Sequence, residues 1–278
     1  MDILQGLILG IVQGLTEFLP VSSSAHLVFV PAILNVQSSL AYDTLLHVGS
    51  LAAVIGFFWK DIIKILKSFV SSLGDMTKRR FKEGLKEDQF KKLAWLIIIG
   101  MIPSGIAGIF LKDFFEGFYS NVVATGFFLI ITGFLLWGSE RVSKRITERK
   151  SVKEMTFKNS LVIGLAQAFA IFPGISRSGA TISAALFLGV DRELAARYSF
   201  LLSIIAILGA ALIQVKDITS LADENIGALI AGFLGALVAG YMAIKLILIL
   251  IKERGLVIFA YYCWIVGILA IILSLFVF

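Results

Sequence analysis

Long apolar stretches, separated by short polar ones, run along almost the whole chain. A helix needs about 20 apolar residues to cross the hydrocarbon core of a bilayer, and six of these stretches approach that length. They predict spans at residues 42–59, 93–111, 120–138, 193–213, 226–250 and 257–277. We therefore expect an all-α integral membrane protein, because spanning helices satisfy their own backbone hydrogen bonds.

Two further apolar stretches are interrupted by a proline and a cluster of hydroxyl residues. Residues 3–34 break at Pro20, which VSSSAH follows, and residues 159–190 break at Pro173, which opens PGISRSGAT. Proline removes a backbone donor and ends a helix, so each stretch should form two short helices. Neither half is long enough to span hydrocarbon, which predicts two re-entrant helical hairpins buried in protein or lining a cavity.

The order of these elements repeats along the chain. Each half, about 1–138 and about 157–278, has one broken hairpin followed by three spans. An odd number of spans inverts the second half, so we expect one membrane domain over residues 1–278, built as an inverted-topology repeat. A short match between GLTE at 14–17 and GLAQ at 164–167 adds weak support. In such repeats the site lies where the two halves meet.

The positions of the charged residues predict the orientation of the chain. Of 278 residues 58% are hydrophobic, and the net charge is +6, a basic balance that nucleic-acid-binding proteins share. The charges are not spread like theirs, however: residues 1–59 hold no Lys or Arg, while 60–92 hold ten of the 25 and 139–158 hold seven. The positive-inside rule predicts that these two basic loops are cytoplasmic, so residue 42 and both termini lie outside. Nucleic acid is not an expected partner.

The second break carries an arginine at membrane depth. Arg177 is flanked by Ser176, Ser178 and Thr181, and the helix that starts after Gly174 offers free N–H groups and a positive dipole end. An intramembrane arginine is costly unless it faces a polar cavity or an anion, and its planar fork suits phosphate. These features favour a phosphate pocket. The alternative is a kinked span in which the arginine pairs with a buried acid.

The first break carries a carboxylate, a serine and a histidine. Glu17 and Gln13 lie four residues apart on one helix face, where Glu17 needs a cation, a donor or a proton. A divalent cation, Mg²⁺ or Ca²⁺, completed by phosphate oxygens would satisfy it, as would protonation. His26 lies three residues after Ser23 and four after Ser22, so a helical turn would place either hydroxyl beside the imidazole, as in an activated nucleophile. A capping serine and a histidine bonded to backbone are the alternative, and His47 is expected at most to support the site.

Together, QGLTEFLPVSSSAH at 13–26 and PGISRSGAT at 173–181 resemble the signature motifs of the bacterial undecaprenyl-pyrophosphate phosphatases, the BacA or UppP family. The resemblance covers the whole chain in length and span pattern. It implies a multi-pass enzyme of the bacterial cell (inner) membrane that converts undecaprenyl diphosphate, a long-chain prenyl diphosphate lipid, to the monophosphate carrier of cell-wall (peptidoglycan) precursors. It also implies resistance to bacitracin, because bacitracin sequesters the diphosphate. A homodimer is compatible with the resemblance.

The resemblance also implies a role for each motif residue. Glu17 and Gln13 match a metal or catalytic (E/Q)xxxE motif, Ser23 the nucleophile, His26 the essential histidine and Arg177 the phosphate-binding arginine. Binding of the substrate phosphates extends to residues around the arginine: Ser176, Ser178, Thr181 and Gly174. Gln13 is neutral where some members have glutamate, so Glu17 is expected to carry more of the metal binding.

The sequence leads to one expectation about the side from which the site is reached, and it leaves one rival function open. Because residues 1–59 lack basic side chains, the site is expected to open outward, toward lipid in the outer leaflet. A secondary transporter or lipid flippase is the rival function, because inverted repeats with broken helices are typical of transporters. On that alternative Glu17 and His26 form a proton relay and Arg177 belongs to an anion site.

Overall fold

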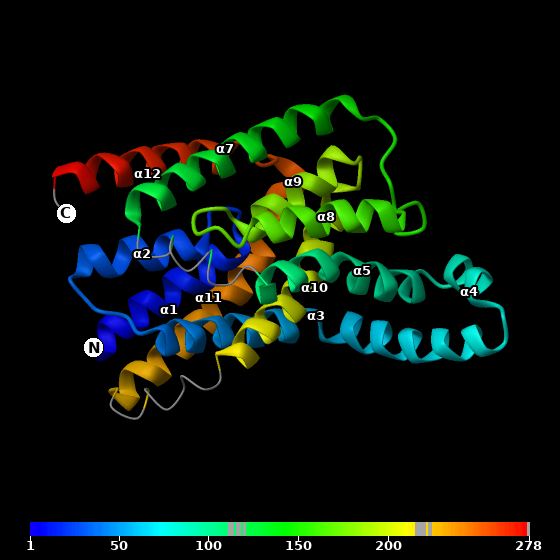
Figure 1. Cartoon of the computed structure of the whole chain (residues 1–278), viewed down its shortest axis with the longest axis horizontal. Helices are drawn as coiled ribbons and strands as arrows, with labels where there is room; N and C mark the ends of the chain where they lie inside the picture. Colours follow the sequence, from blue (N-terminus) through cyan, green and yellow to red (C-terminus); the bar gives the residue numbers. More distant parts are fainter. Residues whose placement is uncertain (111–113, 115–117, 119–120, 215–220, 222–223, 277–278) are drawn as a thin grey trace.

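A computed structural model describes the chain apart from residues 111–113, 115–117, 119–120, 215–220, 222–223 and 277–278 (Figure 1). The described residues form eleven helices, and their one isolated β-bridge joins Lys150 to Val190. Six of the helices are long and apolar enough to cross a membrane. The expectation of an all-α protein with six helices able to span a membrane is therefore confirmed for the described residues.

The six long helices follow the predicted apolar stretches. They are α3 (Leu40–Thr77), α5 (Gln89–Phe110), α7 (Val122–Arg145), α10 (Arg192–Ile213), α11 (Ile226–Glu253) and α12 (Val257–Phe276). The largest difference is in α3, which continues beyond residue 59 through a kink at Phe58, where the backbone is non-helical. The short helix α4 (Phe81–Glu87) follows it, so the segment expected as the first basic loop is largely helical. Its apolar positions keep helical spacing, and an amphipathic stretch forms helix as readily as an apolar one.

Both broken stretches form pairs of short helices, as the prolines predict. The first gives α1 (Ile3–Phe18) and α2 (Ser23–Leu34), and the second gives α8 (Phe157–Phe169) and α9 (Arg177–Phe187). A serine caps the second helix of each pair: the hydroxyl of Ser22 accepts from Ala25 N at 3.4 Å, and that of Ser176 from Gly179 N at 3.0 Å. Capping satisfies a backbone donor that the helix leaves free, which explains why α2 and α9 begin at these residues.

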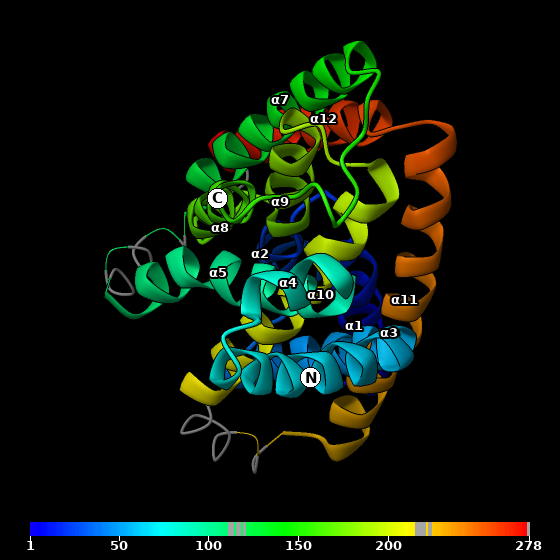
Figure 2. The same ribbon diagram turned by 90° about the vertical axis from the view of Figure 1, so that its right-hand side faces the viewer.

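Glycine contacts position the first helix of each pair. A side chain added to Gly10 of α1 would collide with the backbone of Gly232 in α11, and one added to Gly164 of α8 would collide with Gly100 in α5. Small residues allow such close backbone approach, the usual packing of helices in membranes. Both views show α1 beside α11 and α8 beside α5 (Figures 1 and 2). These contacts fix α1 against α11 and α8 against α5.

A buried ion pair connects the C-terminal part of α7 with the N-terminal ends of α10 and α12. Glu140, which is 2% exposed on α7, accepts two hydrogen bonds from the Arg192 guanidinium at 2.8 and 2.7 Å. The backbone N–H of Leu256, just before α12, donates to the same carboxylate at 3.2 Å. A bidentate arginine–carboxylate pair is geometrically specific, so it fixes α7, α10 and α12 relative to one another.

Candidate functional site

The two helix breaks touch each other inside the molecule. The backbone N–H of Gly174 donates to the Ser24 hydroxyl at 3.3 Å, although 150 residues separate them. The Ser178 hydroxyl donates to the carbonyl of Leu19 at 3.1 Å. The two breaks are therefore in direct contact, and the first turns of α2 and α9 share one junction.

Both half-helices start with the same arrangement of serines. The hydroxyls of Ser22 and Ser24 lie 3.1 Å apart, and those of Ser176 and Ser178 lie 3.2 Å apart. The first N–H groups of each helix have no acceptor within that helix, and the helix dipole places partial positive charge at this end. Because two such ends converge, the junction is suited to an anionic group.

Glu17, at the end of α1, lies at the centre of this junction and is 6% exposed. Its Oε1 accepts a hydrogen bond from Arg177 Nη2 at 2.9 Å. Its Oε2 accepts from the Ser23 hydroxyl at 2.5 Å and from Gln13 Nε2 at 3.0 Å. The Nε2 of His47 lies 3.7 Å from the same oxygen. One carboxylate thus gathers side chains from α1, α2, α3 and α9.

Two buried polar atoms of this junction have no hydrogen-bond partner among the residues that the structure describes: Nη1 of Arg177 and Oε1 of Gln13. Leaving a buried donor or acceptor unpaired costs free energy, so such atoms point to a group that completes the site. A guanidinium nitrogen can only donate, which matches a phosphate oxygen. An amide oxygen can only accept, which matches a cation or a hydroxyl donor.

His26 does not hydrogen-bond to the hydroxyl of Ser23, although their spacing in the sequence suggested that contact. Its Nδ1 lies 2.8 Å from the carbonyl oxygen of Ser22, and its Nε2 lies 2.7 Å from the hydroxyl of Tyr262 on α12. The structure thus pairs Ser23 with Glu17 rather than with His26. The reason is that Ser23 is the first residue of α2 and points back toward α1, while His26 bonds the carbonyl one turn before it.

The other residues expected to bind phosphate shape the second break. Gly174 has a φ of +97°, a conformation that favours glycine, and an added Cβ would collide with Thr125. The Thr181 hydroxyl donates to the carbonyl of Arg177 at 2.8 Å and lies 2.6 Å from the hydroxyl of Ser199. The hydroxyls of Ser176 and Ser178 are bonded as described above. These side chains therefore support the turn and the first residues of α9, with Arg177 at its start.

Three contributors to the site carry little signal in the sequence. His47 reaches Glu17 from α3, Tyr262 reaches His26 from α12, and the Thr132 hydroxyl of α7 accepts from Ser176 N at 3.0 Å. Only the rarity of histidine marks His47, since the chain has two. Tyr262 and Thr132 look like ordinary span residues, and the fold alone brings them to the junction.

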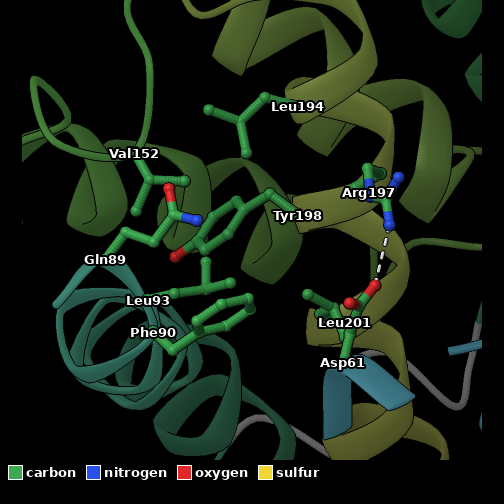
Figure 3. A pocket seen from close by; sticks show the side chains of 9 residues that line it. All are labelled: Asp61, Gln89, Phe90, Leu93, Val152, Leu194, Arg197, Tyr198 and Leu201. Carbon is green, nitrogen blue, oxygen red and sulfur yellow. Dashed lines mark hydrogen bonds and ion pairs between the residues drawn. The ribbon is translucent and has the colours of Figure 1, made fainter. Parts of the chain in front are cut away.

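A separate pocket of about 190 Å³ opens between α3, α5 and α10 (Figure 3). Its charged and phenolic groups are already paired: Arg197 donates to Asp61 at 2.7 Å, and the Tyr198 hydroxyl donates to the carbonyl of Leu96 at 2.7 Å. The remaining lining is mostly apolar. This pocket is therefore a weaker candidate for a catalytic site than the junction at Glu17, because its charged and phenolic groups already have partners.

Comparison with known proteins points to one family. The sequence model of the family described as "Bacitracin resistance protein BacA" matches residues 6–269. An undecaprenyl-diphosphatase of Methanosphaera stadtmanae is 52% identical over 277 residues, 99% of each chain. One of Methanobrevibacter smithii is 50% identical over 270 residues, 97% of this chain and 96% of the relative. One of Halothermothrix orenii is 45% identical over 277 residues, 99% of each chain.

Proposed function

Because this chain belongs to the family of the bacitracin resistance protein BacA, we propose that it is an undecaprenyl-diphosphatase. It hydrolyses undecaprenyl diphosphate to undecaprenyl phosphate and inorganic phosphate. The observation that carries this proposal is the buried, unpartnered Nη1 of Arg177 beside a serine hydroxyl held by Glu17. The product returns to cell-wall synthesis as the peptidoglycan precursor carrier, and removal of the diphosphate confers bacitracin resistance.

Ser23 is the proposed nucleophile. Its hydroxyl lies 2.5 Å from Oε2 of Glu17, which is in position to accept the proton as the oxygen attacks. The bond from Ser23 Oγ to the terminal phosphorus forms while the bond to the bridging oxygen breaks, and undecaprenyl phosphate leaves. Water then attacks the phosphoserine, releases inorganic phosphate and restores the serine. Phosphoryl transfer needs little beyond such positioning and charge stabilisation.

Arg177 and the helix ends are proposed to hold the transferring phosphate. The guanidinium keeps Nη2 on Glu17 and directs Nη1 to a phosphate oxygen, which uses its planar fork. The first N–H groups of α2 and α9 supply further donors. Donors fixed before the reaction stabilise the developing charge without having to reorganise. The turn before α9 positions Arg177, and it is held in place by Ser176, Ser178, Thr181 and Gly174.

His26 is proposed to act on the leaving group or on water. Its contacts with Ser22 and Tyr262 make Glu17 the better acceptor for the Ser23 proton. A variant mechanism has water attack phosphorus directly, with His26 as the base and no phosphoserine. Detection of a phosphoenzyme distinguishes the two routes.

A divalent cation, Mg²⁺ or Ca²⁺, fits the residues at the junction when substrate is present. The protein oxygens on offer are the Glu17 carboxylate and the unpartnered Oε1 of Gln13. The part of the chain that the structure describes holds no cluster of three or more His, Cys, Asp and Glu side chains suited to a metal. Mg²⁺ is commonly held by one or two carboxylates plus substrate phosphates, so this small set of protein ligands is sufficient. Bound there, the cation would neutralise charge on the diphosphate.

The helix contacts support an inverted repeat with two re-entrant hairpins. The first hairpin packs through α1 on α11 of the second half, and the second hairpin packs through α8 on α5 of the first half. The serine caps of α2 and α9 match in the same way. An inverted repeat relates each of these features to its counterpart, and its substrate site lies where the halves meet. Glu17 and Arg177 come from opposite halves.

An outward-facing site is proposed from the charges and from His47. The basic segments 60–92 and 139–158 are assigned to the cytoplasm, which puts the start of α3 outside. The His47 side chain, two turns into α3, is 32% exposed, while that of Glu17 beside it is 5% exposed. Exposure thus rises from the carboxylate toward the outer end of α3. Substrate is proposed to arrive from the outer leaflet.

Release of phosphate tests the enzyme against the transporter. Purified protein in detergent is given undecaprenyl diphosphate with Mg²⁺, with Ca²⁺ or with a chelator, and inorganic phosphate is measured. A diphosphatase releases one phosphate per lipid, and loss of turnover with the chelator would add that the cation takes part in the reaction. A transporter releases none under any of these conditions.

A further inference from the structure

Helix α12 supports the turn between α1 and α2 through two neighbouring side chains. The Tyr262 hydroxyl lies 2.7 Å from His26 Nε2, and the two rings stack with centroids 5.8 Å apart and planes at 11°. The buried thiol of Cys263 lies 3.6 Å from the carbonyl oxygen of Pro20. Both contacts fall on the segment that ends α1 and starts α2.

The contacts of His26 define which nitrogen carries its proton. The carbonyl of Ser22 can only accept, so Nδ1 must donate to it across 2.8 Å. In the neutral imidazole Nε2 then has a free lone pair and accepts from the Tyr262 hydroxyl. Tyr262 therefore holds His26 in the tautomer that binds Ser22.

Ser22 is the residue whose conformation this contact holds. Its φ is +68°, in the left-handed region that a serine seldom occupies. Its hydroxyl caps α2, and its carbonyl is tied to His26. The next residue is Ser23, whose hydroxyl reaches Glu17 at 2.5 Å. A path of bonded groups thus runs from α12 to the attacking oxygen.

We propose that Tyr262 is a positioning residue of the hydrolytic site. Through His26 and the carbonyl of Ser22, it holds the turn in the conformation that presents Ser23 to Glu17. This inference rests on the proposed function, since it assigns Tyr262 to the same reaction. On this proposal Tyr262 acts through His26, without contacting the transferred phosphate itself.

The test compares Tyr262→Phe with Tyr261→Phe. The first change removes the hydroxyl and keeps the ring stacked on His26. Tyr261 is the matched control because it is 53% exposed and contacts the Trp264 ring instead. Losing one hydrogen bond that orients the site should lower kcat about tenfold and leave KM within about twofold. Tyr261→Phe should leave both constants at the wild-type value.

Nitrogen NMR of ¹⁵N-histidine-labelled protein separates positioning from mere stability. The chain has two histidines, and a His47→Gln sample assigns the signals of His26. We expect a proton on Nδ1 in the wild type, a shifted Nε2 signal in Tyr262→Phe, and an unchanged spectrum in Tyr261→Phe. These spectra do not depend on any substrate, so they test the contact even if the wild type releases no phosphate.

Two results would overturn the proposal. An unchanged His26 spectrum in Tyr262→Phe would refute the contact itself. A changed spectrum with wild-type kcat would show that the contact does not position the serine. A fall in kcat together with the shifted Nε2 signal supports the assignment.

Discussion

Replacement of Arg177 removes two interactions that its two terminal nitrogens make separately. Nη2 binds Glu17 at 2.9 Å, and Nη1, which is buried without a partner among the described residues, is proposed to bind phosphate. Loss of one fixed donor to developing charge costs about 2.7–4 kcal/mol, or about 10²–10³ in kcat. The lost ion pair acts separately, on stability: it leaves the Glu17 charge uncompensated, which destabilises the fold by about 3–5 kcal/mol for a buried pair. Arg177→Ala should therefore lower kcat by about 10²–10³ and lower the melting temperature as well.

Arg177→Lys separates these two contributions. A lysine keeps the charge on one nitrogen, so it can hold either Glu17 or the phosphate, but it cannot act as a fork. We expect a melting temperature near that of the wild type and a kcat at least about tenfold lower. Turnover is measured as phosphate release from undecaprenyl diphosphate, beside thermal unfolding of each variant. Arg141→Ala is the control, because that guanidinium stacks 3.8 Å from the centroid of the Trp137 ring. Folded Arg177→Ala protein with wild-type turnover would refute the phosphate pocket.

Three further predictions concern packing, topology and metal. Gly10→Ala should destabilise the protein by about 1–3 kcal/mol through a clash with α11. Gly56→Ala is the control and should leave stability unchanged, because the added carbon meets nothing within 4 Å. Equal melting temperatures of the two variants would contradict this packing. After Cys263→Ser, a cysteine at Ser39 should react with a membrane-impermeant thiol reagent in intact cells, and one at Ser151 only after the membrane is opened. The reverse pattern would overturn the outward-facing topology. Chelation of divalent cations should abolish phosphate release and added Mg²⁺ or Ca²⁺ should restore it, while full activity in chelator would remove the cation from the mechanism.

The helices were predictable because simple rules govern them. A span needs a certain length of apolar sequence, and Pro20 and Pro173 end helices wherever they occur inside an apolar stretch. The continuation of α3 to Thr77 was predictable only in part. The apolar positions between residues 62 and 70 have the spacing of an amphipathic surface helix, but the many charged residues of the segment fit a solvated loop equally well.

The partner of Arg177 illustrates what a sequence leaves open. The two alternatives were a phosphate pocket and an arginine paired with a buried acid. The structure shows the pairing with a buried acid, since Nη2 bonds Glu17, while Nη1 has no partner among the described residues and is left for the proposed phosphate. Which acid lies near an arginine depends on how the halves pack, and that packing comes from glycine contacts between distant helices.

The partners of Ser23 and His26 show the limit of spacing rules. Residues three apart face one another inside a regular helix, but Ser23 is the first residue of α2 and its hydroxyl bonds outside the helix. His47 and Tyr262 reach the junction from other helices, 30 and 236 residues from their partners at Glu17 and His26. The sequence marks His47 as at most a supporting residue, and it contains no signal for the contact between Tyr262 and His26.

Identification of the attacking group tests the central claim most directly. The Ser23 hydroxyl contacts Glu17 at 2.5 Å, whereas that of Ser24 lies 3.1 Å from the Ser22 hydroxyl and accepts from Gly174 N at 3.3 Å. Single-turnover reactions with undecaprenyl diphosphate are quenched and analysed by mass spectrometry, beside phosphate release from Ser23→Ala and Ser24→Ala. We predict phosphate on Ser23, a loss of at least about 10³ in kcat for Ser23→Ala, and a loss of about tenfold or less for Ser24→Ala. Equal turnover of the two variants without a phosphoenzyme would contradict Ser23 as the nucleophile.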